Sequence, residues 1–440
     1  MRNFKIVVIF IVMFICVENV FSFMLEPVTY KHQLNQDLKV QKERGITPDL
    51  LIIGDSTVRS GLDPRIFPKC IPGIKCAINA GTSSQSLCGT YYYLKDITDK
   101  YPIKIAVVGL SYWQFMKSKE KTLKKDFVVL DRITSPILRM EYASKIMTME
   151  EWPLLLKSRQ YCDNFSEVPI NLQMKLSPDY IFGKTGEKEA LLMGYVPLKD
   201  KMGMGNVGIK AEEMKFPDEG IDPESYLYLK KIIELCNKKR ISLHFVSMPV
   251  VSAFFYLNPE IEEINDEILS LTKKSNFYFD DLNLLKARKK IFPDERMNST
   301  DHLSEQSAEQ VTAIYAMMIK NEISGLKNEH DMYPSISDAR SAMNNVMAVD
   351  FHTEPAERGN RKIVARSIAK KNVYPEYRFS ILDEDKKEHV LQDYSLNSEC
   401  ILPSRFVGKK GIIRVDCKTK NENESEVYYQ IIIDATTWEK

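Results

Sequence analysis

The chain has 440 residues, more than a typical single domain contains, so we expect two folded units with connecting segments. Hydrophobic residues make up 44% of it and charged residues 28%, which is the composition of an ordinary globular protein. The net charge of +1 argues against a nucleic-acid-binding surface, so we expect no nucleic acid among the partners.

Residues 1–25 are typical of a signal peptide or a membrane anchor. Arg2 and Lys5 precede an apolar run over residues 6–17, as in an export signal. Residues 20–22 offer a cleavage site, but apolar residues continue to Leu25, which also suits an uncleaved anchor. The polar residues at positions 18 and 19 favour the signal peptide. Both interpretations predict an extracytoplasmic protein, periplasmic or at the cell surface.

The cysteines give a second expectation about the compartment. Beyond Cys16, seven cysteines remain, and in an oxidising compartment the close pairs Cys70/Cys76 and Cys400/Cys417 could be bridged. An odd count leaves at least one thiol unpaired or intermolecular. Because no Cys/His cluster has the spacing of a metal site, we expect neither a metal nor another cofactor.

The middle of the chain alternates between strand-like and helix-like segments. Residues 26–48 are polar and predict a stalk helix, and an α/β domain is expected over residues 49–324. Its buried strands are predicted from apolar runs at 49–54, 75–78, 103–110 and 241–249, and its helices at 84–100, 225–239 and 304–322. Such alternation predicts a central parallel sheet. Residues 117–220, rich in Leu, Met and Lys, predict a helical insertion.

The last part of the chain has a different pattern. Residues 325–345 are polar with little periodicity and predict a linker. Over residues 346–440, short alternating runs at 361–368, 377–382, 411–416 and 426–433 predict a small β-sandwich.

Two polar turns follow predicted strands. Gly54, Asp55 and Ser56 come directly after the first strand, where a serine in a tight turn can expose its hydroxyl at the edge of the sheet that binds ligands. Asn79 and Gly81 follow the next strand, and a glycine there lets a backbone N–H approach a substrate oxygen. Taken alone, either turn could be an ordinary capped turn between a strand and a helix.

A third polar segment, with Asp301 and His302, precedes the predicted helix at 304–322. Histidine is the side chain suited to accept a serine proton near neutral pH, and the chain has only six histidines. A single histidine at the start of a helix is otherwise most often a solvated residue.

These three segments, in this order, resemble the SGNH/GDSL hydrolase superfamily, and within it the branch that contains the D-alanyl transfer and alginate O-acetylation proteins. The resemblance spans about residues 50–322. It implies a flavodoxin-like domain in which Ser56 is the nucleophile, Gly81 an oxyanion donor through its N–H, and His302 the general base.

The sequence departs from the family pattern at two positions. Ser111 follows the third strand, where the family's third block supplies an asparagine as oxyanion donor, so Ser111 could donate instead. Ser299 occupies the position of the usual acid, three residues before the histidine, which leaves Asp301 as the nearest carboxylate to orient His302. Since adjacent side chains in an extended segment point apart, Asp294 and Asp281 remain alternatives.

The C-terminal module resembles, more distantly, the triple-tyrosine β-sandwich of exported polysaccharide-related proteins. Tyr377 and Tyr394 carry this likeness, while Ile412 replaces the third tyrosine. Such modules bind glycans or pack against partners, and the aromatic residues could equally be core residues.

Three functions are compatible with these residues. The first is an O-acyltransferase, acetyl being the expected group, that modifies a cell-envelope or extracellular polysaccharide through an acyl-enzyme on Ser56, with a membrane partner as acyl donor. The second is a carbohydrate O-acetyl esterase that uses the same site. The third is a non-catalytic protein that binds glycans or assists their assembly.

Overall fold

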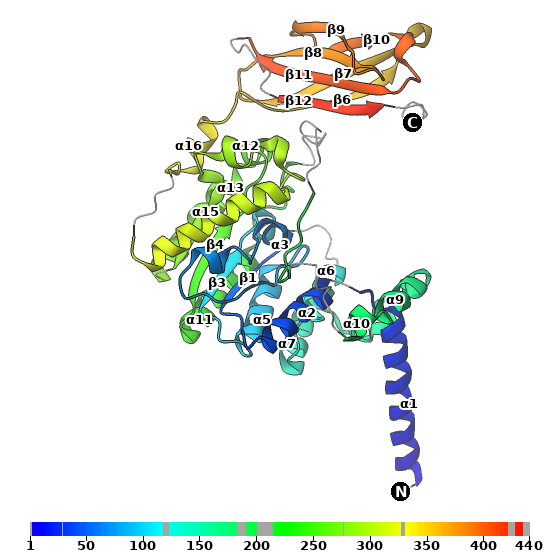
Figure 1. Cartoon of the computed structure of the whole chain (residues 1–440), viewed down its shortest axis with the longest axis vertical. Helices are drawn as coiled ribbons and strands as arrows, with labels where there is room; N and C mark the ends of the chain where they lie inside the picture. The colour runs from blue at the N-terminus through cyan, green and yellow to red at the C-terminus, as the bar shows by residue number, and fades with distance from the viewer. Residues whose placement is uncertain are drawn as a thin grey trace. The chain divides into compact units, whose positions relative to one another are not determined.

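The computed structural model describes residues 2–28, 30–117, 123–182, 191–199, 214–275, 277–326, 331–420 and 427–433 (Figure 1). The chain forms two compact units. The first comprises Met1–Gly109, Glu120–Val196 and Pro223–His244, and the second comprises Leu110–Lys119, Pro197–Asp222 and Phe245–Lys440.

Helices and strands alternate through most of the chain. Up to the third strand the elements are α1 (Arg2–Leu25), α2 (Tyr30–Glu43), β1 (Leu50–Ile53), α3 (Ser56–Gly61), α4 (Phe67–Cys70), β2 (Ala77–Asn79), α5 (Leu87–Thr98) and β3 (Ile105–Gly109). Then come η1 (Tyr112–Phe115), α6 (Leu123–Leu130), α7 (Pro136–Ile146), η2 (Met149–Leu155), α8 (Lys157–Gln160), η3 (Cys162–Glu167), α9 (Val168–Lys175), α10 (Pro178–Phe182) and α11 (Pro223–Lys239).

The remaining elements complete the α/β fold and form the C-terminal module. They are β4 (Ser242–Ser247), α12 (Ser252–Leu257), α13 (Glu260–Ser275), β5 (Tyr278–Asp281), η5 (Leu282–Leu284), α14 (Arg288–Ile291), η6 (Asp294–Arg296), α15 (Glu305–Ile323), α16 (Ile336–Ser341), β6 (Val346–Pro355), η7 (Glu357–Gly359), β7 (Arg361–Ala369), β8 (Pro375–Leu382), β9 (Glu388–Ser395), β10 (Glu399–Leu402), η8 (Ser404–Phe406), β11 (Gly411–Thr419) and β12 (Val427–Ile433).

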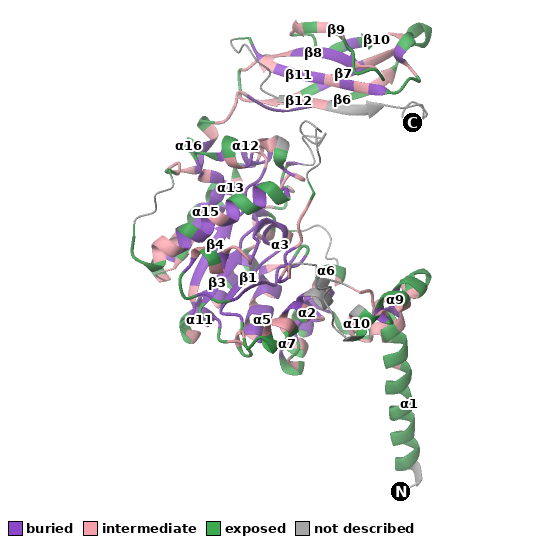
Figure 2. Ribbon diagram, in the orientation of Figure 1, coloured by how far each residue is buried: buried purple, intermediate pink, exposed green. Residues whose placement is uncertain are grey.

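A five-stranded sheet in the order β2-β1-β3-β4-β5 is the centre of the α/β fold. β1 pairs in parallel with β2 and β3, so that Leu50 lies opposite both Ala77 and Ile105. All residues of β1, β2 and β3 are buried, as Figure 2 shows for β1 and β3, and this is why the strands read as continuous apolar runs. The expected central parallel sheet is confirmed. The short strand β5 was not predicted.

The expected insertion at 117–220 is helical over residues 123–182, where α6 to α10 follow one another, while its described residues 191–199 carry no helix. Residues 118–122, 183–190 and 200–213 of the insertion lie outside the described residues.

The expected linker at 325–345 contains a helix. α16 is capped by Ser335, whose hydroxyl accepts a hydrogen bond from the amide of Asp338. Arg340 of α16 donates to the carbonyl oxygens of Phe255 (3.1 Å) and Asn258 (2.6 Å), at the end of α12. This part of the expected linker therefore packs against the α/β fold of its own unit.

The C-terminal module consists of two antiparallel sheets, ordered β10-β7-β6 and β12-β11-β8-β9. Side chains from both sheets form one core, including Phe351, Ile363, Phe379 and Ile413. The four strands that the sequence predicted here are present, and β6, β9 and β10 are additional.

The two disulfide bonds that the sequence left open do not form. All eight cysteines lie among the described residues and none is disulfide-bonded, neither Cys70 and Cys76 nor Cys400 and Cys417. Cys400 and Cys417 belong to the core of the C-terminal module. Burial raises the pKa of the Cys76 and Cys400 thiols to about 11, which keeps both protonated. These cysteines therefore act as small hydrophobic side chains.

Candidate functional site

Ser56 is the first residue of α3, directly after β1 and the turn at Gly54 and Asp55. Asp55 caps the helix: its Oδ1 accepts hydrogen bonds from the amide (3.0 Å) and the hydroxyl (2.6 Å) of Thr57. Asp55, Thr57 and Val58 are buried, but Ser56 is only half-buried. Within the described part of the first unit, the Ser56 hydroxyl donates to no other residue. The turn thus presents one serine hydroxyl from an otherwise buried backbone.

Close packing sets the position of this turn. Gly54 has a φ of +151°, and a Cβ on it would lie 3.0 Å from the carbonyl oxygen of Gly109, at the end of β3. A Cβ on Gly109 would lie 2.2 Å from Cγ1 of Val58. Glycine is required at both positions because the backbones and Val58 leave no room for a methyl group. α3 therefore sits tightly against the carboxyl end of β3.

Asn79 and Gly81 join the second turn to the first. The buried Asn79 side chain donates through Nδ2 to the carbonyl oxygens of Val58 (2.8 Å) and Leu62 (2.9 Å), and its Oδ1 accepts from the Gly81 amide (3.0 Å). A Cβ on Gly81 would lie 3.1 Å from the carbonyl oxygen of Asp55. From the sequence, Asn79 could be identified only as part of a motif. In the structure, the Asn79 side chain connects α3 to the glycine turn.

The Gly81 amide thus donates to Asn79 in this structure, so its role as an oxyanion donor stays a prediction. The amide of Ser56, at the start of α3, is a further candidate donor because the first N–H groups of a helix have no partner within the helix. No other described residue of the first unit accepts a hydrogen bond from it.

Arg132 is a residue near this site that the sequence analysis missed. Its buried guanidinium donates through Nη1 to the carbonyl oxygens of Ala80 (3.4 Å) and Gly81 (3.3 Å). It follows α6, which belongs to the insertion, and its position 51 residues after Gly81 gave no sequence signal.

His302 lies in a short hairpin of the second unit, where Met297 and Leu303 form an antiparallel bridge. The His302 Nδ1 atom is 2.7 Å from Oδ1 of Asp301 and 2.9 Å from Oγ of Ser299, and the Ser299 hydroxyl also donates to Asp301 (3.2 Å). The adjacent Asp301 and His302 side chains therefore meet, because the hairpin turns here and is not extended. Asp301 and His302 are both half-buried.

The two alternative carboxylates have structural partners. Asp281, at the end of β5, accepts hydrogen bonds from the Tyr112 hydroxyl (2.6 Å) and Asn265 Nδ2 (3.0 Å). Burial raises the pKa of Asp281 above its ordinary value, and the hydrogen bond from Tyr112 opposes this rise. Asp294 accepts from Arg288 (3.0 Å) and from the amide of Ser252 (2.9 Å). Asp301, in contrast, contacts Nδ1 of His302 (2.7 Å).

Ser111 precedes η1 and is buried. Its amide donates to Oε1 of Gln114 (3.0 Å), and its carbonyl oxygen accepts from the Gln114 amide (3.0 Å). This pairing starts the 3₁₀ turn, and the role of Ser111 as an oxyanion donor stays a prediction. Over the described ranges, no group of three or more His, Cys, Asp and Glu side chains could hold a metal ion.

Comparisons with known proteins add little to this geometry. No family model matches the chain, and no curated protein matches it. A crystal structure of an engineered protein aligns over 93% of this chain and 97% of its own, at 10% identity and with a TM-score of 0.15. A likeness this weak carries no argument about fold or function.

Proposed function

We propose that this chain is an exported, serine-dependent O-acyltransferase, with acetyl as the expected group and an extracytoplasmic polysaccharide as acceptor. The observation that carries the proposal is the half-buried Ser56 at the start of α3, between the buried residues Asp55 and Thr57. The motifs around Ser56, Gly81 and His302 resemble the SGNH/GDSL superfamily, and the sheet order 2-1-3-4-5 is that of flavodoxin-like folds.

In the proposed reaction, the Ser56 hydroxyl attacks the carbonyl carbon of an acyl donor and its proton passes to Nε2 of His302. A proton on Nδ1, held by Asp301, leaves Nε2 as the basic nitrogen of the ring. The tetrahedral intermediate collapses, and the leaving group takes the proton from His302. An acceptor hydroxyl then gives its proton to His302 and attacks the acyl-Ser56 ester. The bond from the acyl carbon to Ser56 Oγ breaks, and Oγ takes the proton back from His302.

A membrane-proximal location favours transfer over hydrolysis. The described part of the chain has one helix long and apolar enough to cross a membrane, Phe4–Leu25. A chain held at the membrane is placed to receive an acyl group from a membrane partner. Water and the acceptor hydroxyl compete for the same acyl-enzyme, so acceptor binding decides the outcome.

The test is acetyl release from p-nitrophenyl acetate by the full chain in detergent, with and without a sugar-oligomer acceptor. Ser56→Ala and His302→Ala should each lower the rate at least about 100-fold. Matched controls are Ser144→Ala, an exposed serine of α7, and His352→Ala, whose Nε2 is 3.1 Å from Oε1 of Glu354 in the C-terminal module. Both controls should keep the activity of the unmodified chain.

Acetylated acceptor that depends on both Ser56 and His302 would support the transferase. Hydrolysis without acceptor transfer would assign the same site to a carbohydrate esterase. Equal rates in the unmodified chain and all four variants would contradict the catalytic proposal and leave a glycan-binding or assembly role.

A further inference from the structure

The helix α1 is exposed over residues 4–17, and its carboxyl end is covered, with Leu25 only 1% exposed. Residues Phe4–Leu25 form a candidate membrane span of 22 residues, and none of its most apolar window is buried by the rest of the chain (Figure 2). At 1.5 Å per residue, a helix of this length covers about 33 Å, which matches the hydrocarbon core of a bilayer.

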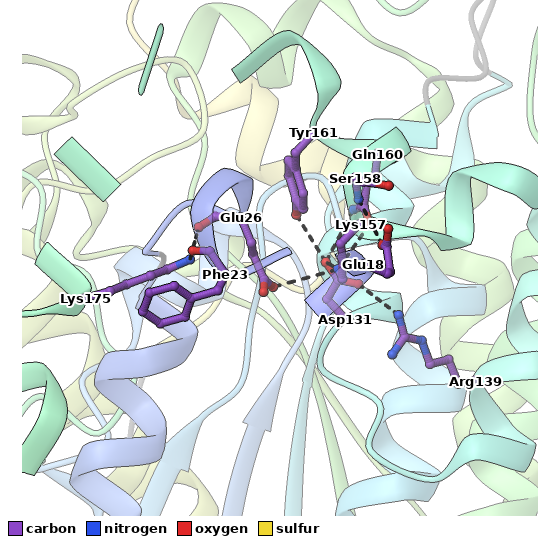
Figure 3. Close-up of polar contacts among 10 residues, drawn as sticks. All are labelled: Glu18, Phe23, Glu26, Asp131, Arg139, Lys157, Ser158, Gln160, Tyr161 and Lys175. Carbon is purple, nitrogen blue, oxygen red and sulfur yellow. Dashed lines mark hydrogen bonds and ion pairs between the residues drawn. The ribbon is translucent and has the colours of Figure 1, made fainter. Parts of the chain in front are cut away.

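The carboxyl end of α1 is bound by α9. The Lys175 ammonium donates to the carbonyl oxygen of Phe23 (2.6 Å) and to that of Glu26 (Figure 3). Asn171 Nδ2 donates to the carbonyl oxygen of Leu25 (3.4 Å). The last carbonyl groups of a helix have no partner within the helix, and a positive charge there interacts favourably with the helix dipole. α9 therefore caps α1 with two side chains one turn apart.

A second group of contacts holds the same end of α1 to α8. Glu18 accepts a hydrogen bond from the amide of Ser158 (3.0 Å). Lys157 pairs with Asp131, and its Nζ atom is 3.8 Å from Oε1 of Glu26. Asp131 also accepts from the Tyr161 hydroxyl (3.1 Å), as Figure 3 shows. α1 thus joins the insertion through backbone and side-chain contacts on two helices.

The polarity of α9 is reversed relative to a surface helix of a soluble protein. Its buried face carries Asn171 and Lys175, 4% and 3% exposed, while Ile170 is 61% and Met174 46% exposed. Leu176, just after the helix, is 61% exposed. A soluble helix would place the apolar side chains inward and the lysine outward. Exposed apolar side chains continue on both sides, with Phe165 of η3 and Ile181 of α10.

We propose that α1 is retained as a transmembrane anchor, and that η3, α9 and α10 lie in the interfacial layer of the bilayer that α1 crosses. α9 contacts the end of the span through Lys175 and Asn171, so its exposed apolar side chains belong to an element bound to the helix that crosses the bilayer, and a lipid surface is the partner that fits them. Lys175 and Asn171 bind the last turn of α1, which includes the hydrogen bond from the Glu26 amide to the Ser22 carbonyl oxygen (3.0 Å). Cleavage after Ser22 would remove this carbonyl group, so the bound helix end requires the residues before Phe23.

This proposal does not rest on the acyltransferase. Between residues 157 and 182 the segment carries three basic residues (Lys157, Arg159, Lys175) and three acidic residues (Asp163, Glu167, Asp179), so we expect apolar contact and not charge to hold it at the membrane.

The first test measures depth in a bilayer. The full chain, with the exposed Cys16 and Cys162 replaced by serine, carries a fluorophore at Met174→Cys in nanodiscs of phosphatidylcholine. Nitroxide lipids labelled near the acyl carbonyl should quench this probe at least about twofold more than a probe at Val390→Cys, an exposed apolar position of β9. The chain without an introduced cysteine measures background labelling. Equal quenching at the two positions would overturn the interfacial proposal.

The second test concerns the capture of α1. The intact mass of the protein purified from membranes should include α1, and a mature chain that begins after residue 22 would overturn retention.

In Lys175→Met, the amides of residues 23–26 should exchange hydrogen about tenfold faster, because the helix end loses its cap. Lys145→Met, at an exposed lysine of α7, is the control and should leave these amides unchanged. Unchanged exchange in Lys175→Met would contradict the capture.

Discussion

The two loops that carry the candidate chemistry are built by different forces. The Ser56 turn is fixed by close packing, because Gly54, Gly109 and Val58 fill the space between α3 and the end of β3. The His302 hairpin is fixed by hydrogen bonds among half-exposed polar side chains. We therefore expect substitutions in the first loop to change the free energy of unfolding, and substitutions in the second to change activity while leaving stability nearly intact.

The largest effect on stability is expected for Gly109→Ala. The new methyl group would overlap Val58 Cγ1, and overpacking of this kind costs about 3 kcal/mol. Chemical denaturation measures the loss. Val58→Ala removes the colliding methyl groups, so the double variant should be at least about 1 kcal/mol more stable than the sum of the single effects predicts. Additive effects would show that packing does not define this turn.

Asn79→Ala is expected to cost about 2 kcal/mol, because the carbonyl oxygens of Val58 and Leu62 lose a buried donor. Asn237→Ala, at an exposed position of α11, is the matched control and should stay within about 0.5 kcal/mol of the unmodified chain. Similar losses in the free energy of unfolding of the two variants would show that Asn79 does not stabilise the link between α3 and the glycine turn.

The smallest effect on stability is expected in the second loop. Asp301→Ser should change the free energy of unfolding by less than about 0.5 kcal/mol, yet lower kcat/KM for acetyl release about 100-fold, because the His302 ring loses its orienting carboxylate. The double variant Ser299→Asp/Asp301→Ser returns a carboxylate to the other side chain that contacts Nδ1, and should recover at least about tenfold.

Asp383→Ser, which removes the carboxylate 2.8 Å from His389 in the C-terminal module, is the control and should not alter kcat/KM. A double variant no more active than Asp301→Ser would argue that Asp301 does not orient the base.

The same contrast explains which parts could be predicted from the sequence. The strands β1 to β4 were predicted because buried parallel strands are continuous apolar runs. β5 was missed, since Tyr278 and two aspartates occupy four residues, and such a segment has neither the apolar run nor the alternation of a strand. α16 was missed because its six residues are mostly polar and its contacts involve Arg340, which donates to carbonyl groups distant in sequence.

Within the candidate site, residue types were predictable and contacts were not. Ser56 and His302 stand next to elements with a clear pattern, so their positions could be proposed. The contact between Asp301 and His302 depends on a hairpin that no pattern in the sequence predicts. The binding of Arg132 to the glycine turn depends on how the insertion folds back. One sequence feature could have indicated the binding of α9 to α1: Asn171 and Lys175 are four residues apart, so both lie on one face of the helix.

The two consecutive residues that follow α6 contact different parts of the first unit. Asp131 pairs with Lys157 near the end of α1, and Arg132 donates to the carbonyl groups of the glycine turn beside the Ser56 loop. A truncated chain that starts beyond Glu26, the usual choice for soluble expression, would lose Glu18 and Glu26, which contact Ser158 and Lys157, and Lys157 is the residue that pairs with Asp131. Assays of such a truncation would then report on a site whose surroundings differ from those in the full-length chain.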